Sequence, residues 1–381
     1  MAKITLDNLA HSYMPNPSSE DDYALKELNH DWVDGEAYAL LGASGCGKST
    51  LLNIISGLLH PSQGRILFND RDVTNDPTTK RNIAQVFQFP VVYDTMTVRD
   101  NLAFPLRNRG ADAAYVAQRV QQIAGMIGME DMLNRKARGL TADAKQKISL
   151  GRGMVREDVN ALLFDEPLTV IDPHMKWELR TQLKSLHHEF GHTMIYVTHD
   201  QTEALTFADK VVVMYDGRVV QMGTPQELFE TPQHTFVGYF IGSPGMNFFH
   251  GKVESGAQGP VTRFGGHDIP LPAKCAGMSG RDMIFGIRPE HIRVGEDGPG
   301  VALSLVENLG TEKILHFHTP GENVLELDRA QVGADEERDA QTMLIRVIDD
   351  RRYSEAETLA LAFPVEKLHV FDPDTHEAAA G

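Results

Sequence analysis

The stretch that most restricts how this chain can fold is GASGCGKST, residues 42–50. It follows an apolar run, AYALL, and precedes a helical run, LLNIISGLL. In that context the pattern G-x-x-x-x-G-K-[ST] forms a loop whose backbone N–H groups wrap phosphate oxygens, and the helix N-terminus adds positive potential. A plain glycine-rich turn is the alternative, and the flanking strand and helix argue against it. The sequence therefore predicts a nucleotide phosphate site here.

Residues within this loop have separate predicted roles. Lys48 reaches the β and γ phosphates, and the Ser49 hydroxyl ligates Mg²⁺. ATP and Mg²⁺ are thus the expected ligands. The predicted ATP contacts are Gly42, Ala43, Ser44, Gly45, Cys46, Gly47, Lys48, Ser49 and Thr50.

A second apolar strand, in NALLFDEP over residues 160–167, ends in two carboxylates. Asp165 is predicted to orient Mg²⁺ and its water, and Glu166 to polarise the water that attacks the γ phosphate. An acidic strand-to-loop turn without catalytic function is the alternative.

Two further strands end in polar side chains. His199, in IYVTHD, can hydrogen-bond the γ phosphate and hold Glu166 in register, and Gln88, in VFQF, can ligate Mg²⁺ through its amide oxygen. Taken alone, each would be an ordinary residue at a strand end, but their order among the other motifs favours function. We therefore predict catalytic roles for Glu166, His199 and Gln88, and Mg²⁺ ligation by Ser49, Gln88 and Asp165.

An aromatic residue near the N-terminus is a candidate to stack on adenine. Tyr13, in HSY, is the preferred one, and Tyr23, after the polar insertion MPNPSSEDD, is the weaker rival. Either can instead be a half-buried aromatic without a ligand.

The pattern of apolar runs and turn residues changes along the chain. From about residue 3 to 235, short apolar runs alternate with helical stretches, which is typical of a mostly parallel sheet covered by helices. Residues 99–155 are helical without strands and predict an inserted subdomain. Beyond FVGYFIGSPGMNFF, short strands separated by Gly, Pro and acidic turns, among them ILHFHTP and NVLELDRA, predict a small β-barrel or sandwich. We expect the boundary near residues 236–248.

Composition excludes several classes of protein. The two cysteines, Cys46 and Cys275, are far apart and indicate a reducing, cytoplasmic setting. Apolar runs stay far shorter than the roughly 20 residues that cross a bilayer. The net charge is −17, and residues 236–381 hold 13 Lys and Arg against 23 Asp and Glu, so a long nucleic-acid footprint is not expected.

In their order along the chain, the phosphate loop, VFQ, LTADAKQ, LLFDEP, TVID and THD resemble the ATPase subunits of ABC transporters over residues 3–240. GIRPEHI, VENLGTEKILHF and LHVFDPDT resemble the barrel extension of carbohydrate-importer ATPases of the maltose type. The resemblance implies an α/β fold: a P-loop, RecA-like ATPase core over residues 1–240, with its helical subdomain at about 89–157. An all-β, OB-like regulatory or dimerisation domain would follow over residues 241–381.

The resemblance also implies partners. Such subunits are peripheral on the cytoplasmic face of the inner membrane and act as dimers. Each ATP lies between the phosphate loop of one subunit and the signature motif of the other. Asp172, in TVID, matches the family's dimer-communicating aspartate, and the groove around Gln88 would receive two transmembrane permease subunits, which are supplied by a periplasmic solute-binding protein.

The signature motif departs from the family pattern of Leu-Ser-Gly-Gly-Gln. An aspartate at a helix start facing ATP is unfavourable, because each unit of like charge at about 5 Å costs on the order of 3 kcal/mol at an effective dielectric of about 20. The alternative is that Asp143 caps the helix and turns away from nucleotide. The aligned residues here are Leu140, Thr141, Ala142, Asp143 and Ala144.

This degenerate signature leads us to expect a second, non-identical ATPase subunit whose intact signature completes the competent site. FQFPVVYDTMTVRDNLAF, GLTADAKQKISLGRG and DEPLTVIDPHMKW look most like the paired ATPase subunits of bacterial glycerol importers. The expected function is ATP-driven uptake of a small polyol or carbohydrate, with glycerol favoured.

Two functions of other classes remain as alternatives. A soluble ABC ATPase would be expected to carry a second core or a coiled-coil insertion, and neither is evident. In a nucleotide-dependent regulatory module, Glu166 or His199 would be expected to be missing. His316 and His318 alternate on one strand of the barrel, and without further ligands we expect solvated or core histidines there and no metal site.

Overall fold

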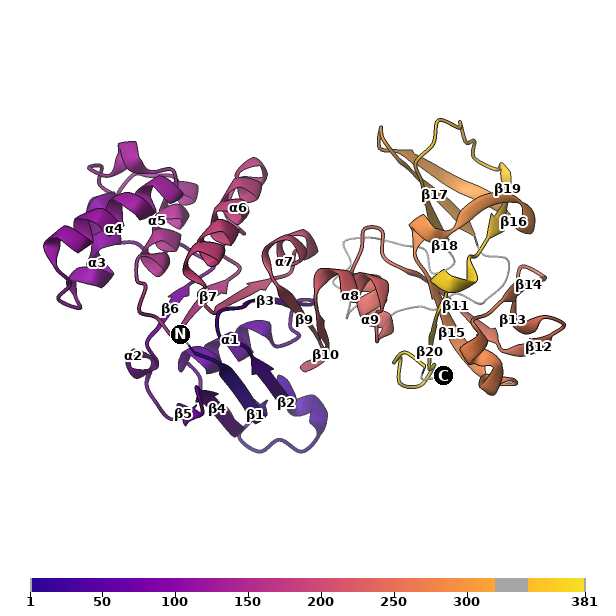
Figure 1. Cartoon of the computed structure of the whole chain (residues 1–381), viewed down its shortest axis with the longest axis horizontal. Coiled ribbons are helices and arrows are strands. Elements are labelled where there is room, and N and C mark those ends of the chain that lie inside the picture. Colours follow the sequence, from indigo (N-terminus) through magenta and orange to yellow (C-terminus); the bar gives the residue numbers. More distant parts are fainter. Residues whose placement is uncertain (1, 319–341, 380–381) are drawn as a thin grey trace. The chain divides into compact units, whose positions relative to one another are not determined.

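The computed structural model describes residues 2–318 and 342–379, which divide between Pro225 and Gln226 into two compact units (Figure 1). This division falls at the start of α8 (Pro225–Glu230), and α9 (Thr235–Phe240) also precedes the first strand of the second unit. The domain boundary expected at 240/241 stays a prediction. The predicted strand NVLELDRA lies outside the described residues. No helix among residues 2–318 and 342–379 is long and apolar enough to cross a membrane.

A six-stranded sheet forms the centre of the first unit. Its middle strands are buried along almost their whole length, as continuous apolar runs such as AYALL and MIYVT require when helices cover both faces. The carboxyl ends of these parallel strands share one edge, where the polar motifs follow. The strand order is β10 (Arg218–Gly223), β9 (Lys210–Tyr215), β3 (Ala37–Leu41), β8 (Met194–Thr198), β7 (Ala161–Asp165) and β6 (Ile83–Val86), with β10 antiparallel to β9.

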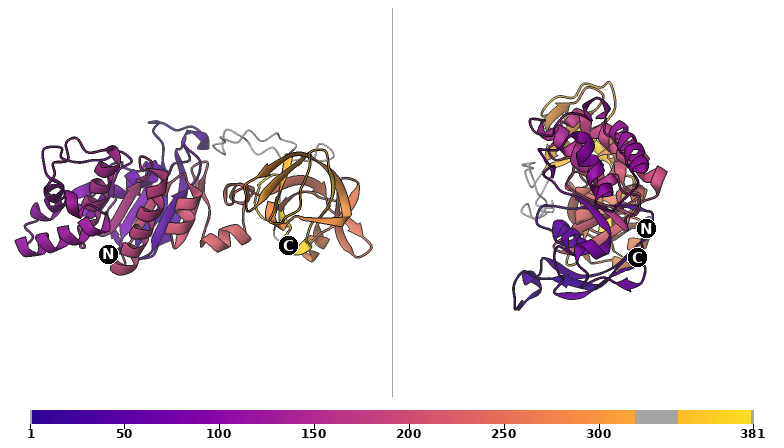
Figure 2. Two further views of the ribbon diagram at one scale, coloured as in Figure 1. Left: turned by 90° about the horizontal axis from the view of Figure 1, so that it is seen from above. Right: turned by 90° about the vertical axis from the view of Figure 1, so that its left-hand side faces the viewer.

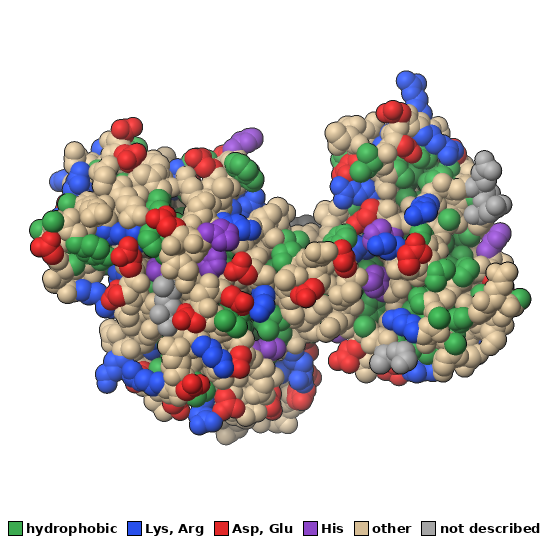
Figure 3. Space-filling model, in the orientation of Figure 1, with side chains coloured by type: hydrophobic (Ala, Val, Ile, Leu, Met, Phe, Trp, Pro, Cys, Tyr) green, Lys and Arg blue, Asp and Glu red, His purple; other side chains and the backbone are tan. Residues whose placement is uncertain are grey.

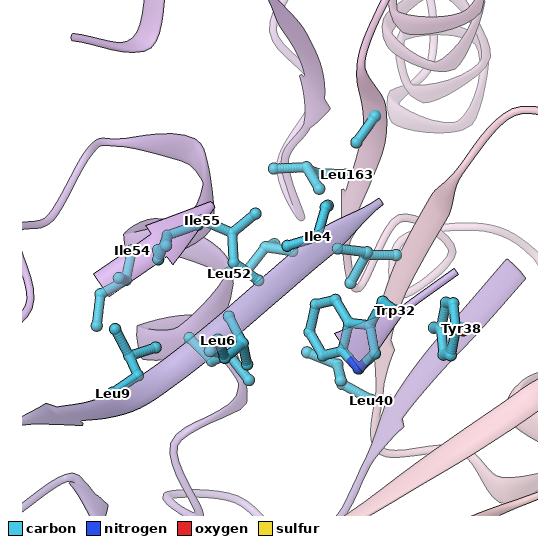
Figure 4. Packing of buried hydrophobic residues seen from close by; sticks show 14 of the residues in the cluster. Ile4, Leu6, Leu9, Trp32, Tyr38, Leu40, Leu52, Ile54, Ile55 and Leu163 are labelled. Carbon is cyan, nitrogen blue, oxygen red and sulfur yellow. The ribbon is translucent and has the colours of Figure 1, made fainter. Parts of the chain in front are cut away.

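A second sheet of the same unit is antiparallel. It packs against helix α1 (Lys48–Ser56) and the parallel sheet through one apolar cluster, part of which Figure 4 shows. Within that cluster Trp32 and Tyr38 stack with ring centroids 5.6 Å apart. The strand order is β2 (Leu25–Trp32), β1 (Ile4–His11), β4 (Gln63–Phe68) and β5 (Arg71–Asp72).

The predicted helical subdomain is present between β6 and β7. Buried Arg119 ties its helices together by donating to the carbonyls of Met154 and Val155, at 3.0 Å each. The subdomain consists of α3 (Val98–Arg107), α4 (Ala113–Met126) and α5 (Ala142–Met154). The other helices of this unit are α2 (Thr78–Arg81), α6 (Pro173–Phe190) and α7 (Gln201–Phe207).

The second unit is built of antiparallel strands around its own apolar cluster, and Figure 2 shows their barrel-like curvature. Buried Arg288 donates to the carbonyls of Phe229 and Ile241, at 2.9 and 2.6 Å. The prediction of an α/β core followed by an OB-like all-β domain is therefore confirmed. The strands are β11 (Asn247–Lys252), β12 (Glu254–Gly256), β13 (Gly259–Phe264), β14 (His267–Pro270), β15 (Asp282–Ile287), β16 (Arg293–Asn308), β17 (Lys313–His318), β18 (Thr342–Val347), β19 (Thr358–Ala362) and β20 (His369–Phe371).

The two histidines singled out on β17 form no metal site with their described neighbours. His316 Nε2 lies 2.6 Å from Glu307 Oε1 on the adjacent strand. Within the described ranges, no group of three His, Cys, Asp or Glu side chains is arranged to hold a metal ion.

Candidate active site

The phosphate loop connects β3 to α1, and two of its glycines are sterically required. Gly47, the N-cap of α1, has φ +100°, and a Cβ there would lie 2.6 Å from the Ala24 carbonyl oxygen. A Cβ on Gly42 would lie 2.2 Å from the Met214 carbonyl oxygen. Only glycine fits these positions without displacing backbone, so the loop can take the shape that presents its N–H groups.

Lys48 is folded over this loop. Its Nζ donates to the carbonyl oxygens of Gly42 and Ala43, both at 2.8 Å, and the side chain is buried. The Cys46 thiol is also buried, and this burial raises its pKa. The loop thus holds one ammonium group close to its own backbone, where a phosphate can replace the carbonyls as its partner.

Asp165 and Ser49 meet at the ends of β7 and the phosphate loop. The Ser49 hydroxyl donates to Asp165 Oδ1 at 3.1 Å. Burial raises the pKa of the Asp165 carboxyl, Ser49 opposes that rise, and the charge of Glu166 adds to it. The Asp165 carboxylate and the Ser49 hydroxyl thus place two oxygen ligands side by side, and oxygen ligands fit Mg²⁺.

Glu166 lies at the centre of a polar cluster. Its backbone adopts φ +45°, an uncommon conformation for a non-glycine residue, and its N–H donates to the Val197 carbonyl at 3.0 Å. Gln88 Nε2 donates to Glu166 Oε2 at 3.3 Å, and His199 Nδ1 lies 3.1 Å from Oε1. The structure therefore brings together the three residues to which we assigned catalytic roles.

Tyr13 is the more available of the two aromatic candidates. Its ring is 65% exposed, and its hydroxyl lies 3.1 Å from Thr50 Oγ1, directly beside the phosphate loop. Tyr23 instead accepts a hydrogen bond from Gln63 through its hydroxyl, at 2.9 Å. The geometry places Tyr13, rather than Tyr23, in contact with the predicted ATP residues.

The first turn of α5 (Ala142–Met154) shows which residue of the signature segment caps the helix. Thr141, and not Asp143, is the N-cap, and its hydroxyl accepts from the Ala144 N–H at 3.3 Å. Asp143 lies in the first helical turn, and its Oδ1 is shielded from solvent without a hydrogen-bond partner among the described residues. Interpreting Asp143 as a cap is therefore wrong, because Thr141 occupies the cap position and Asp143 lies inside the helix.

Sequence reasoning missed the function of Gln146. Its buried amide donates to the carbonyl oxygens of Phe87 and Pro167, at 3.1 and 2.8 Å. These two residues are the immediate neighbours of Gln88 and Glu166 in the chain. Gln146 thus joins α5 to the loops that carry Gln88 and Glu166, and its place on the buried side of an amphipathic helix was the only available signal.

Asp172 caps α6, since its Oδ1 accepts from the His174 N–H at 3.0 Å. Within the described residues, no hydrogen bond or ion pair joins Leu140–Ala144 or Asp172 to the phosphate loop. The residues with predicted catalytic roles are therefore assembled within the chain, whereas the signature and Asp172 are not part of that assembly.

A strand-borne phosphate loop with a Glu–His–Gln cluster beside it defines a P-loop ATPase with an inserted helical subdomain. The ABC transporter family profile matches residues 25–169, and that of the MalK OB fold domain matches residues 242–292. The trehalose import ATP-binding protein SugC of Mycobacterium tuberculosis H37Rv is 37% identical, over 98% of each chain. The sn-glycerol-3-phosphate import ATP-binding protein UgpC of Escherichia coli K12 is 37% identical, over 92% of this chain and 94% of that protein.

Among solved structures, cbiO1 of Clostridium perfringens, part of an ABC transporter complex, superposes with a TM-score of 0.54 and 29% identity, over 60% of this chain and 90% of that one. The chain belongs to the import ATP-binding proteins of the ABC transporter family that carry a MalK-type OB domain. Members of this family are ATPases, and the chain is accordingly an ATP-binding ATPase subunit.

Proposed function

We propose that this chain hydrolyses ATP to drive uptake of a small polyol or carbohydrate, and that its contact with the membrane is made through permease subunits. The observation that carries the proposal is the cluster of Glu166, His199 and Gln88 beside Ser49 and Asp165. We infer that these groups meet the γ phosphate of an ATP on the phosphate loop and its attacking water.

The chemistry follows from the donors and acceptors present. Glu166 accepts a hydrogen bond from the attacking water and takes its proton as the new P–O bond forms and the bond to ADP breaks. His199 fixes the Glu166 carboxylate and can donate to the γ phosphate. Lys48 neutralises charge on the phosphates. Mg²⁺, held by Ser49, Asp165 and Gln88, would supply further neutralisation.

The surface beside Gln88 supports contact with membrane subunits. Phe89, Val91 and Tyr93 are 69, 50 and 39% exposed and occupy alternate positions in the segment after Gln88. Exposed apolar side chains in such a row favour a protein partner. We assign this surface to the cytoplasmic helices of two permease subunits, which places the chain peripherally on the cytoplasmic face of the inner membrane and, indirectly, downstream of a periplasmic solute-binding protein.

The solute is proposed only as a class. The relatives reported above are named for trehalose and for sn-glycerol 3-phosphate import, which share a polyhydroxylated carbon skeleton. Glycerol itself rests on the resemblance of the motifs. The test is to purify the native complex from membranes and measure which solute stimulates its ATPase. Stimulation by glycerol, glycerol 3-phosphate or trehalose supports the class, and recovery of the ATPase without permease subunits would contradict it.

We also propose that the second ATPase subunit is a different chain. The support is the aspartate at the start of α5, where close approach to a γ phosphate favours glycine. The relatives lend no support to an unlike partner, so Asp143 alone carries this step. Mass spectrometry of the native complex decides it: two distinct ATPase chains are expected, and a vigorously hydrolysing homodimer would refute the pairing.

A further inference from the structure

One face of α6 carries an aromatic and a cationic series. Trp177, Arg180, Lys184 and His188 recur every three or four residues, and such residues lie on the same side of a helix. Together with Thr206 of α7 they line a pocket of about 240 Å³, near the small end of ligand pockets. Figure 1 shows α6 and α7 side by side.

The lining combines cations with hydroxyl groups. Thr181 and Ser185 complete it, and no Asp or Glu is among the described residues that line the pocket. Elsewhere the two signs of charge are mixed, as the face drawn in Figure 3 shows. In a chain of net charge −17, a pocket without acidic residues is a local positive site that attracts anions.

Arg180 and Lys184 in this pocket have N–H donors that no described residue accepts from. Arg180 has no hydrogen-bond or ion-pair partner among the described residues, and its Nε is shielded from solvent. Lys184 Nζ donates to the Thr206 carbonyl oxygen at 3.0 Å, which leaves two N–H donors. The Nη groups of Arg180 therefore have no acceptor in the described part of the chain, and an anionic ligand can supply one.

The neighbouring carboxylate does not serve as that acceptor. Glu203 Oε1 accepts from Lys176 at 3.2 Å, and its Oε2 accepts from Tyr196 and Thr198, both at 3.0 Å. Glu203 thus accepts from three other side chains, and none of its described bonds is to Arg180, whose guanidinium remains available to a ligand.

Trp177 supplies a flat apolar surface at the mouth of the pocket. It is 67% exposed, whereas the other tryptophan, Trp32, is fully buried. An indole face beside two cations matches a ligand with a ring next to an anionic group.

We propose that the pocket between α6 and α7 binds a small phosphate monoester carried on a flat ring, either an aromatic ring or the face of a sugar. The Arg180 guanidinium pairs with two phosphate oxygens, Lys184 supplies a second charge, and the ring packs on Trp177. Because Asp172 is the N-cap of α6 and α7 begins two residues after His199, such a ligand bridges the two helices that follow these residues.

Tryptophan fluorescence tests the proposal directly, because acrylamide quenches exposed Trp177 far more readily than buried Trp32. The full chain is titrated, with ADP filling the phosphate loop, with phenyl phosphate and with glucose 6-phosphate. Saturable protection of Trp177 from quenching by at least one of them is expected. The two probes distinguish an aromatic from a sugar ring.

Variants make the test specific. Arg180→Gln and Lys184→Gln should each weaken binding at least 10-fold, while Arg65→Gln, which removes one exposed charge on β4, should leave it unchanged. ADP binding by each variant verifies its fold, and calorimetry of Trp177→Phe confirms binding without the reporter. No protection with either probe, equal affinity in Arg180→Gln and Arg65→Gln, or binding of phenol as tight as that of phenyl phosphate would overturn the proposal.

Discussion

His199 Nδ1 lies 3.1 Å from Glu166 Oε1, although the two residues follow different strands and are separated by a long helix in the sequence. Glu166 Oε2 simultaneously accepts from Gln88 at 3.3 Å. The carboxylate is therefore fixed from two sides, which is the arrangement expected of a group that must orient a water molecule.

Glu166→Gln should reduce ATP turnover by about 100-fold or more while ATP binding is retained, because the amide preserves size but cannot take a proton from water. Turnover in the native complex and nucleotide affinity are the measurements. Glu178→Gln makes the same change at an exposed position of α6 and serves as control. Near-normal turnover of the Glu166 variant would assign the base to another residue.

Tyr13→Ala should weaken ATP binding by about 3- to 10-fold, since stacking of an aromatic pair contributes about 0.5–1.5 kcal/mol. Tyr13→Phe keeps the ring, loses only the hydroxyl near Thr50, and should bind nearly as well as the natural chain. Tyr23→Ala should have no effect. Equilibrium binding of a fluorescent ATP analogue measures all three, and a larger loss with Tyr23→Ala would exchange the assignments.

Asp143→Gly should raise ATP turnover of the assembled complex, because it removes negative charge and a side chain from the signature. Asp143→Asn removes the charge alone and separates the two causes. Glycine in the first turn of α5 costs up to about 1 kcal/mol in helix stability, so thermal unfolding is recorded alongside. Unchanged or lower turnover in both variants would refute the charge argument.

Gln146→Leu should destabilise the first unit by about 1–3 kcal/mol, because the carbonyls of Phe87 and Pro167 lose their buried donor. It should also lower turnover more than ATP affinity, since the bonds hold the loops of Gln88 and Glu166. Urea unfolding and turnover are compared with Gln121→Leu, a change at an exposed position of α4. Lost stability with unchanged turnover would make Gln146 purely structural.

Acid should loosen the second unit locally. Burial lowers the pKa of His234 and of His369 from 6.5 to about 4, so between these values the unfolded chain binds more protons than the folded one. The contribution is therefore intact above pH 6.5 and is lost as the pH falls toward 4. Allowing for partial solvent screening, the two histidines together remove on the order of 2 kcal/mol by pH 5.

Hydrogen exchange of the amides in α9 and β20 measures this effect. His234 Nδ1 also accepts from the Phe236 N–H at 3.0 Å as the N-cap of α9, and protonation removes that acceptor. His234→Asn keeps a capping oxygen without titrating in this range, so it should flatten the dependence for α9. Identical acid sensitivity in this variant would exclude His234 as its origin.

The sequence alone determined the fold class, because the residues that form each strand, helix or phosphate loop are contiguous in the chain. Buried strands such as AYALL read as continuous apolar runs, and the phosphate loop needs Gly42 and Gly47 at fixed spacing. Gln88, Glu166 and His199 follow three apolar runs in a fixed order among the other motifs, and that order favoured roles in one reaction. That reasoning anticipated that Glu166, His199 and Gln88 belong to one site.

Tertiary structure decided what depends on register and on long-range packing. Only the folded chain shows that Thr141 caps α5 and that Gln146 spans to two loops, because hydrogen-bond partners distant in sequence leave no local pattern. Likewise, the sequence around Trp177, Arg180 and Lys184 is typical of an ordinary exposed helix. Only the packing of α7 beside α6 makes these side chains the lining of a pocket. Sequence specifies which side chains are available, whereas packing determines which of their donors and acceptors are left to meet a ligand.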